Sequence, residues 1–394
     1  MTPLRVTAFT STTAAGHGNA AFARALIEDQ SGLRLNDFTS QPLNTWIGRV
    51  DGVETIDFPD RFAEWECRNN RLAWLGLQAD GMLDSIGTVC RRYGAERVAL
   101  VLGTSTSSIG ATEEAYTRLD ADGRFPPDMR RPVVHTPGSL GDFLALALGI
   151  RGPCVTTSTA CSSSAKIFAQ AERLIRLGIV DAAVVGGVDT LCGSVLFGFN
   201  SLELVSPDPC QPFDVARRGI SLGEAAAFAV LERHGDAVAS FVGYGESSDA
   251  HHMSSPHPGG LGARVALDAM MARARIAPPD VDYINLHGTA SQKNDEIEAT
   301  AVAQLFPANT AASSTKGWTG HTLGAAGIVE SVVCLLAIRH GFRPGMLTTK
   351  TLDPACGPQI RLAGEHRPVN IALTQSFGFG GNNGVLAFAR ELAA

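Results

Sequence analysis

The sequence is short of lysine and of net positive charge. Only four lysines occur among its 394 residues, and the formal net charge is −7. Nucleic-acid-binding domains carry a basic face, so this composition argues against broad nucleic-acid binding. Any acidic partner would have to be recognised by a local group of arginines.

The sequence also lacks the patterns of a secreted, metal-binding or membrane-spanning chain. Its eight cysteines include no C-x-x-C pair and none with a histidine at zinc-ligand spacing, so we expect free thiols and no metal site. No N-terminal segment resembles a signal peptide, and no apolar run approaches the ~20 residues that cross a bilayer. We therefore expect a cytoplasmic protein without a membrane span.

Strand-like and helix-like segments alternate along the chain. This alternation predicts an α/β protein with a largely parallel sheet and helices on its faces. The order of elements is similar in two parts of the chain, so we expect two halves, residues 1–235 and 236–394. The expected strands are 4–9, 97–102, 155–157, 182–185, 282–286, 311–314 and 371–373, and the expected helices are 19–26, 68–93, 140–149, 165–178, 295–306 and 323–340.

Residues 153–178 predict a strand, a tight turn and a helix, with Cys161 in the turn. Backbone N–H groups and the positive end of the helix dipole favour a thiolate at such a position. The small neighbours of Cys161 leave room for a substrate carbonyl beside the sulfur. An arbitrary cysteine is more often buried and inert, so the hypothesis of a nucleophile depends on what the rest of the chain supplies.

Two histidines and one lysine occupy similar glycine-rich turns. His287 ends an expected strand, and His321 precedes an expected helix, with Lys316 five positions before it. Sites in parallel α/β sheets form at the ends of strands, so both imidazoles could project into one cleft with Cys161. Each histidine could instead be a hydrogen-bonded core residue.

Two other segments carry polar or glycine-rich runs among apolar residues. Residues 375–383 predict a flexible turn that could bring backbone N–H groups close to a ligand and move an aromatic lid. Glu224 lies among small apolar residues, and we interpret it as a structural carboxylate paired with Arg217 or Arg218.

Together these segments resemble the β-ketoacyl-acyl-carrier-protein synthases of the elongating type, which belong to the thiolase superfamily. The resemblance implies the thiolase fold, with two pseudo-duplicated βα halves in a five-layer αβαβα arrangement. It also implies a homodimer, or a heterodimer with a related ketosynthase or chain-length-factor chain. The matching motifs are TACSSSA at 159–165, QPFD at 211–214 followed by Arg218-Gly219 and Gly223-Glu224, HGT at 287–289 with Asn294-Asp295, the run 316–321, and FGFGG at 377–381.

The reaction implied by this resemblance is a decarboxylative Claisen condensation with malonyl-acyl-carrier protein. Cys161 would hold the acyl chain as a thioester, and His287 and His321 would bind the thioester carbonyl of the malonyl group. The substrates travel on the phosphopantetheine of the carrier protein, so no other cofactor is expected. The remaining residues implied by the resemblance are Lys316 matched with Glu298, and Phe379 as both an oxyanion-hole N–H beside that of Cys161 and a gate.

The resemblance leaves the acyl chain and the pathway open. Ser105 and Thr106 stand where fatty-acid enzymes have glycine and a bulky aliphatic residue, and with Phe377 we expect them to line the acyl pocket. A more polar or unsaturated chain, as in aryl polyene pathways, would suit such a pocket. Ordinary variation in a loop would also explain both residues.

Four arginines are the candidates for docking the acidic carrier protein. Arg68 and Arg71 lie one helical turn apart, and Arg130 and Arg131 come next. A solvated basic face would explain them equally well.

The alternative function is that of a non-catalytic chain-length-factor-like partner in a ketosynthase heterodimer. Such subunits normally replace the nucleophile, whereas Cys161 is present. The sequence therefore favours the catalytic assignment.

Overall fold

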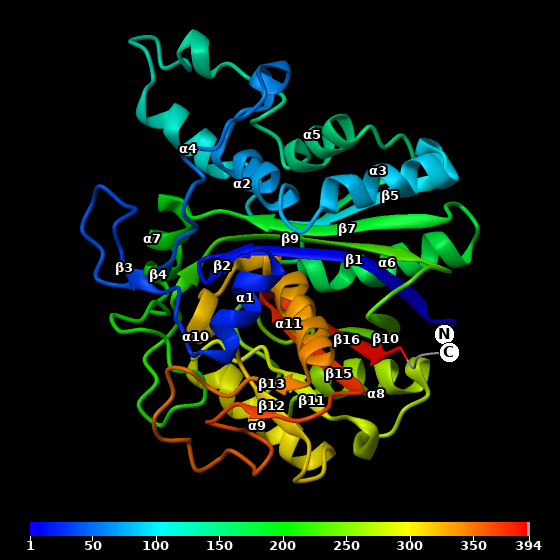
Figure 1. Ribbon diagram of the computed structural model, residues 1–394. Helices are drawn as coiled ribbons and strands as arrows, with labels where there is room; N and C mark the ends of the chain where they lie inside the picture. The colour runs from blue at the N-terminus through cyan, green and yellow to red at the C-terminus, as the bar shows by residue number, and fades with distance from the viewer. Residues whose placement is uncertain (392–394) are drawn as a thin grey trace.

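The computed structural model describes residues 1–391, in which helices and strands alternate (Figure 1). An eleven-stranded sheet runs in the order β12-β11-β15-β16-β10-β1-β9-β7-β5-β6, with β2 beside β1. Two small sheets, β3-β4-β8 and β13-β14, lie outside it. The strands are β1 (Leu4–Thr13), β2 (Gly16–His17), β3 (Arg34–Leu35), β4 (Trp46–Gly48), β5 (Val98–Gly103), β6 (Cys154–Thr157), β7 (Ala182–Asp189), β8 (Leu222–Gly223), β9 (Ala225–Glu232), β10 (Ala239–Ser248), β11 (Tyr283–Asn285), β12 (Ala311–Ser313), β13 (Phe342–Arg343), β14 (Glu365–His366), β15 (Ile371–Gly378) and β16 (Asn382–Arg390).

Helices and the two parts of the large sheet stack in five layers (Figure 1). Helices α2, α3 and α5 form one outer layer on β9, β7 and β5, while α8 and α9 form the other outer layer. Between the two parts of the sheet lie α6 and α11, which contact each other. This is the αβαβα arrangement that the sequence implied. The helices are α1 (Gly18–Ile27), α2 (Arg68–Leu77), α3 (Met82–Tyr93), α4 (Ile109–Thr117), α5 (Ser139–Leu148), α6 (Ser163–Arg176), α7 (Gly193–Ser201), α8 (Leu261–Ala274), α9 (Gln292–Leu305), α10 (Lys316–Thr319) and α11 (Ala326–His340).

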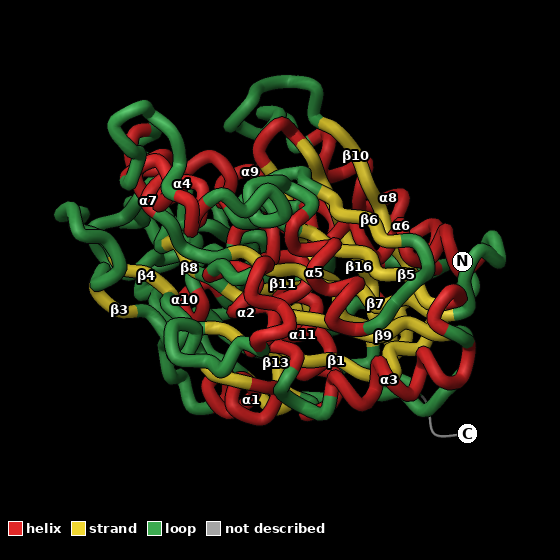
Figure 2. Tube along the Cα trace, turned by 90° about the horizontal axis from the view of Figure 1, so that it is seen from above, coloured by secondary structure: helices red, strands yellow, loops and turns green. Residues whose placement is uncertain are grey.

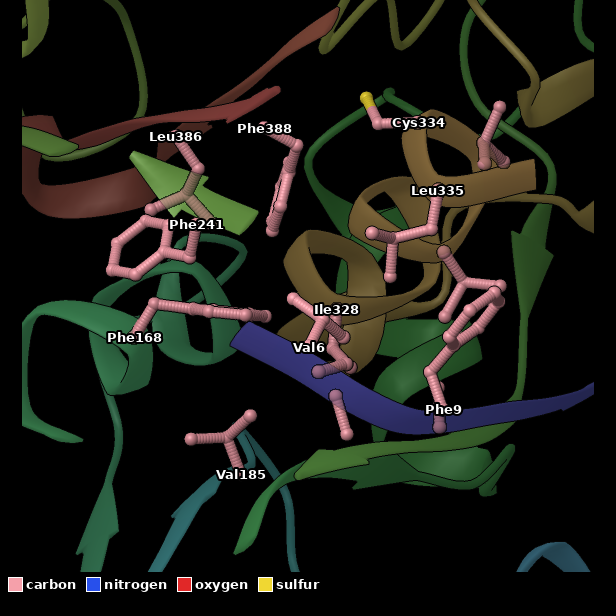
Figure 3. Close-up of a cluster of buried hydrophobic side chains, with 14 of the residues drawn as sticks. Val6, Phe9, Phe168, Val185, Phe241, Ile328, Cys334, Leu335, Leu386 and Phe388 are labelled. Atoms are coloured by element: carbon pink, nitrogen blue, oxygen red, sulfur yellow. The ribbon is translucent and has the colours of Figure 1, made fainter. Parts of the chain in front are cut away.

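The middle layer is held by apolar side chains from both parts of the sheet (Figure 3). Phe168 of α6 packs against Phe241 of β10 and Phe388 of β16, with ring centroids 5.3 and 5.6 Å apart. Ile328 and Leu335 of α11 belong to the same cluster. Burying each such side chain contributes about 1.5–3 kcal/mol. The two central helices, and the turns that precede them, are therefore fixed relative to both parts of the sheet.

The sheet is mixed, so the expectation of a largely parallel sheet was wrong. Parallel pairing is confined to β5 with β6 and β7, and to β11 with β12 and β15; the remaining neighbours in the large sheet are antiparallel. The connections explain part of this pattern. Only the three-residue turn Phe379–Gly381 joins β15 to β16, and so short a connection permits only an antiparallel pair.

Two segments differ from their predicted form. The helix expected over 68–93 is two helices, α2 and α3, separated by a turn in which Asp80 and Gly81 have φ of 54° and 66°. Residues 375–383, predicted as a flexible turn, instead contain the end of β15 and the start of β16. The glycine-rich turn between these strands is short and hydrogen-bonded: Gly380 N–H donates to the Met253 carbonyl at 2.7 Å.

Within residues 1–391, the segment 323–340 is long and apolar enough to cross a membrane, a property that we had not expected of any segment. In the fold, 89% of it is buried inside the protein, because α11 is a core helix of the middle layer. Glu330 lies halfway along it and pairs with Lys316 inside the protein.

Candidate active site

Three turns that are far apart in the sequence bring Cys161, His287 and His321 together. Cys161 lies between β6 and α6, His287 follows β11, and His321 lies between α10 and α11. Nε2 of His321 is 3.0 Å from Sγ of Cys161, and the two imidazole centroids are 5.4 Å apart. All three side chains are buried. The predicted convergence of one sulfur and two imidazoles is therefore confirmed.

The backbone around these turns is tight. Ala160, immediately before Cys161, has φ of 50°, a left-handed conformation that is uncommon for a residue with a Cβ. On the other side of the sulfur, His321 is held by β8 and the residue before it: the His321 N–H donates to the Ser221 carbonyl at 2.7 Å, and the Gly223 N–H of β8 donates to the His321 carbonyl at 2.9 Å. Seen from above, α7, β8 and α10 lie together on the loop-rich side of the molecule (Figure 2).

A backbone hydrogen bond sets the tautomer of His321. The N–H of Leu323 donates to Nδ1 of His321 at 3.2 Å. A ring nitrogen that accepts a hydrogen bond carries no proton, so the proton of the neutral imidazole is on Nε2. Nε2–H therefore donates toward Sγ of Cys161 and is placed to donate to a substrate oxygen bound there.

Burial raises the pKa of the Cys161 thiol to about 11, although the nearby Lys316 charge and the backbone N–H groups of Phe379 and Cys161 lower it. The expected thiolate is thus corrected: desolvation outweighs the helix N-terminus, and the resting residue is a thiol. The N–H groups of Phe379 and Cys161 nevertheless lie close enough to the sulfur to lower the pKa of the thiol. They can stabilise negative charge that develops beside it.

Both imidazoles are neutral near pH 7. Burial and the Lys316 charge hold the pKa values of His287 and His321 well below their usual range, and for His287 the His321 ring adds to this effect. A neutral imidazole donates one hydrogen bond without bringing a charge into the cavity. The pair is therefore suited to binding a carbonyl oxygen and its enolate.

Lys316 pairs with Glu330, so the predicted match with Glu298 is corrected. Nζ of Lys316 is 2.5 Å from Oε1 of Glu330 and also donates to the backbone carbonyl of His287. Burial raises the pKa of Glu330 to about 7, while the Lys316 charge lowers it. The sequence reasoning missed Glu330, although a single carboxylate inside an apolar helix was a signal that could have found it.

Glu298 supports His287 through the backbone. Its two carboxylate oxygens accept the N–H groups of His287 and Gly288 at 2.7 and 2.8 Å. Asp295 continues this support by accepting the Thr289 N–H at 3.1 Å. Burial raises the pKa of Glu298 to about 8 and that of Asp295 to about 6. Together the two carboxylates fix the turn that aims His287.

The three side chains open into a cavity of about 530 Å³. Phe377 and Phe379 line it, and Arg218 and Lys293 also contribute to its wall. Phe379 stacks on Phe199 with ring centroids 5.7 Å apart. The cavity thus combines reacting groups with aromatic walls.

Ser105 and Thr106 do not line this cavity, although Phe377 does. Both hydroxyls donate to the buried carboxylate of Asp189, at 2.9 and 2.7 Å. These side chains satisfy Asp189, a residue that the sequence reasoning missed, and their role in an acyl pocket stays a prediction.

All four candidate docking arginines form hydrogen bonds or ion pairs with other residues of the protein. Arg68 donates to Oε2 of Glu224 through Nε at 3.1 Å and to Oε1 through Nη2 at 2.6 Å, and it also contacts Glu54. Glu224 is therefore structural, as expected, but its partner is neither Arg217 nor Arg218. The guanidinium of Arg68 is committed to this buried carboxylate, which argues against a docking role.

The other three candidates lie nearer the surface. Arg71 pairs with Glu66, and Arg131 donates to the Glu66 carbonyl at 2.6 Å. Arg130 is exposed and lies 3.6 Å from Asp120. These arginines remain predictions for carrier-protein docking.

The donor atoms of Cys161, His287 and His321 lie within 4.8 Å of one another, close enough to hold one metal ion. A thiolate and two imidazoles would suit Zn²⁺. A ligating nitrogen must be unprotonated, however, whereas the Leu323 N–H keeps the proton of His321 on Nε2. The arrangement fits hydrogen-bond donation better than metal binding.

Two family models match the chain. The model "Beta-ketoacyl synthase, N-terminal domain" covers residues 1–237, and "Beta-ketoacyl synthase, C-terminal domain" covers residues 238–350. Among curated proteins, the chain is 31% identical over 415 aligned residues to 3-oxoacyl-[acyl-carrier-protein] synthase 2 of Mycobacterium bovis, covering 98% of this chain and 96% of that protein. It is 34% identical to nodulation protein E of Rhizobium meliloti, covering 79% and 80% respectively.

A solved structure is similar over nearly the whole length. It is described as the ketosynthase ApeO in complex with its chain length factor ApeC, from Xenorhabdus doucetiae. The TM-score is 0.92 at 36% sequence identity, and the match covers 99% of this chain and 98% of that chain.

Proposed function

The chain belongs to the β-ketoacyl synthase family, and we propose that it extends an acyl chain on a carrier protein by two carbons, with loss of carbon dioxide. The observation that carries this proposal is the 3.0 Å contact between Nε2 of His321 and Sγ of Cys161, with His287 facing the same cavity. A non-catalytic chain-length-factor subunit would not need a thiol and two imidazoles arranged in this way.

In the first half-reaction, Cys161 takes the acyl group from the phosphopantetheine thioester of the carrier protein. The sulfur attacks the carbonyl, the carrier thiol departs with the proton of Cys161, and an acyl-cysteine remains. The N–H groups of Cys161 and Phe379 already face the sulfur, so they are placed to serve as the oxyanion hole.

In the second half-reaction, His287 and His321 donate hydrogen bonds to the thioester carbonyl of malonyl-carrier protein. The bond to the carboxylate carbon breaks, carbon dioxide leaves, and the electron pair remains in an enolate. The enolate carbon attacks the acyl-cysteine carbonyl, and the Cys161 sulfur leaves as a thiolate that takes up a proton from water. The neutral state of both imidazoles supports this assignment.

Three other side chains have supporting roles in this proposal. Lys316 and Glu298 position His287 through its backbone carbonyl and N–H groups. Phe379 is the gate between the two half-reactions, because its backbone N–H faces the sulfur while its ring stacks on Phe199 at the cavity wall.

The partners follow from the same reaction. We propose an acyl carrier protein that docks through Arg71, Arg130 and Arg131, and either a homodimer or a heterodimer with a chain-length-factor chain. The resemblance to the ApeO–ApeC structure, a ketosynthase with its chain length factor, supports the heterodimer. We keep an aryl polyene-type pathway as the proposed pathway, with primary fatty acid synthesis as the alternative. The eight free thiols support a cytoplasmic location. We place the division between the two halves at 235/236, in the connection between β9 and β10.

The test is to incubate the protein with acyl- and malonyl-carrier protein and to follow the product and the adduct by mass spectrometry. We expect an acyl adduct on Cys161 and a β-ketoacyl product. The Cys161→Ala variant should lose both, whereas Cys90→Ser, which alters a half-buried thiol on the outer helix α3 away from the cavity, should retain both. The acyl group trapped by a His287→Ala variant would identify the substrate.

The outcome that contradicts this proposal is the absence of both adduct and product when the protein is alone, together with their appearance only on a second subunit. That result would assign the chain the chain-length-factor role.

A further inference from the structure

The carboxylate of Asp189 is buried at the end of β7 and accepts hydrogen bonds from six donors. Five belong to the turn after β5: the hydroxyls of Thr104, Ser105 and Thr106, and the backbone N–H groups of Ser105 and Thr106, at 2.6–3.0 Å. The sixth is the backbone N–H of Gly324, at 2.6 Å. Because backbone N–H groups can only donate, both carboxylate oxygens act as acceptors.

Gly324 connects this carboxylate to the active site. A Cβ at position 324 would lie 2.6 Å from Oδ2 of Asp189 and 2.5 Å from the Ser105 nitrogen, so only glycine permits the approach. The preceding residue, Leu323, has φ of 56°, a left-handed conformation that is unfavourable for a leucine. Leu323 thus needs neighbouring contacts to hold it in place.

The same Leu323 donates the hydrogen bond that determines the tautomer of His321. A chain of contacts therefore runs from Asp189 through the Gly324 N–H and the Leu323 backbone to Nδ1 of His321. It ends at Nε2–H, 3.0 Å from Sγ of Cys161.

We propose that Asp189 is a positioning residue for the condensation: it holds the 323–324 turn in the conformation that keeps His321 in the Nε2–H tautomer. Asp189 touches neither the substrate nor the reacting atoms. Its effect on the rate rests on the proposed role of His321 as a hydrogen-bond donor, whereas its effect on the tautomer does not.

The test compares the full-length protein with its Asp189→Asn variant, which keeps the size of the side chain but replaces one acceptor oxygen by an N–H donor. Histidine-selective ¹⁵N NMR reports the tautomer of His321, assigned with His321→Ala. We expect the single Nε2–H signal of the wild type to give way to a mixture of tautomers. The rate of malonyl-carrier-protein decarboxylation should fall about 10- to 100-fold, with little change in KM.

Two further variants make the result specific. Asp181→Asn removes a carboxylate just before the other end of β7, where it pairs with Arg97 at the surface, and should change neither the tautomer nor the rate. Asp189→Glu keeps an acceptor and should restore part of both. If Asp189→Asn does not fold, Gly324→Ala tests the same contact, because the added methyl group would collide with Asp189 and disturb the hydrogen bond from the Gly324 N–H. This variant should also shift the tautomer of His321.

The outcomes separate this proposal from the proposed function. An unchanged tautomer in a folded Asp189→Asn protein, or in Gly324→Ala, would overturn the positioning role even if the protein unfolds at a lower temperature. A shifted tautomer with an unchanged rate would keep the link from Asp189 to His321 and would remove the assignment of His321 as a donor in the reaction.

Discussion

Cys161, His287 and His321 can be recognised in the sequence because each lies among small or glycine residues at a turn. Two of their supporting residues, Glu330 and Asp189, cannot be recognised in this way. The partner of Lys316 is Glu330, fourteen positions away on α11, and the pairing is decided by how that helix packs against the sheet. In the sequence, Asp189 is simply the last residue of an apolar strand. Its hydrogen-bond donors come from the turn after β5 and from the 323–324 turn, which only the fold brings beside it. At the residue scale, the reacting groups and the supporting Glu298 could be predicted from the sequence, whereas the pairing of Glu330 and the contacts of Asp189 depend on how distant segments pack together.

The thiol of Cys161 gives a pH-dependent test. Because burial raises its pKa to about 11, the thiolate fraction increases throughout the range from pH 7 to 10. We expect alkylation of Cys161 by iodoacetamide, followed by peptide mass spectrometry, to accelerate roughly tenfold per pH unit. His321→Ala should slow it at each pH, since the N–H donor to the sulfur is lost. A rate that is already constant below pH 8 would instead indicate a resting thiolate.

The buried pair of Lys316 and Glu330 gives a stability test. Lys316→Met leaves the Glu330 carboxylate buried without its cation, so we expect a loss of about 3–5 kcal/mol in the free energy of unfolding by urea. The double variant Lys316→Met/Glu330→Leu removes both charges and should recover most of this loss. A single variant as stable as the wild type would show that the pair is not coupled.

At the scale of elements, the apolar run of β5 predicted its strand, whereas the alanine-rich strand β9 was not predicted. β9 contains Ala225, Ala226, Ala227 and Ala229, and alanine has a low strand propensity. It is a strand because β1 and β7 pair with it on either side and its residues are fully buried. Tertiary pairing thus determines this segment.

The two central helices approach each other closely beside the turns of the site. A Cβ on Gly327 of α11 would lie 2.5 Å from the Ala165 nitrogen of α6, and the Ile328 N–H donates to Ser164 Oγ at 3.0 Å. These contacts set the distance between the turn of Cys161 and that of His321.

The Gly327→Ala variant should therefore push α6 and α11 apart. We expect a loss of about 1–3 kcal/mol in stability and a fall in kcat, because the separation of His321 from Cys161 increases. Stopped-flow assays and a crystal structure of the variant would measure both effects. Gly87→Ala, on the outer helix α3 where the only atom within 4 Å is the flexible end of Arg91, is the control for glycine loss that leaves the interface untouched. An unchanged kcat in Gly327→Ala would show that the helix spacing does not control the reaction.

At the scale of the whole molecule, the edge strand β6 is the surface on which we expect a second chain to assemble. Within residues 1–391 it pairs only with β5, so its other side offers backbone groups to a second chain. We expect a related ketosynthase chain to pair there, and Thr156→Pro to shift the protein from dimer to monomer in analytical ultracentrifugation. Thr156→Val keeps the backbone donor and should remain dimeric. A dimeric Thr156→Pro protein would place the interface elsewhere.

The position of α11 also affects how the chain reaches its native state. A segment apolar enough to enter a bilayer has no favourable surroundings until the strands on both sides of it are complete, and β15 and β16 follow it in the sequence and so leave the ribosome after it. We therefore expect 323–340 to need protection by a chaperone during synthesis. Expression at low temperature, or with a chaperonin, is the condition under which we expect the highest yield of native enzyme.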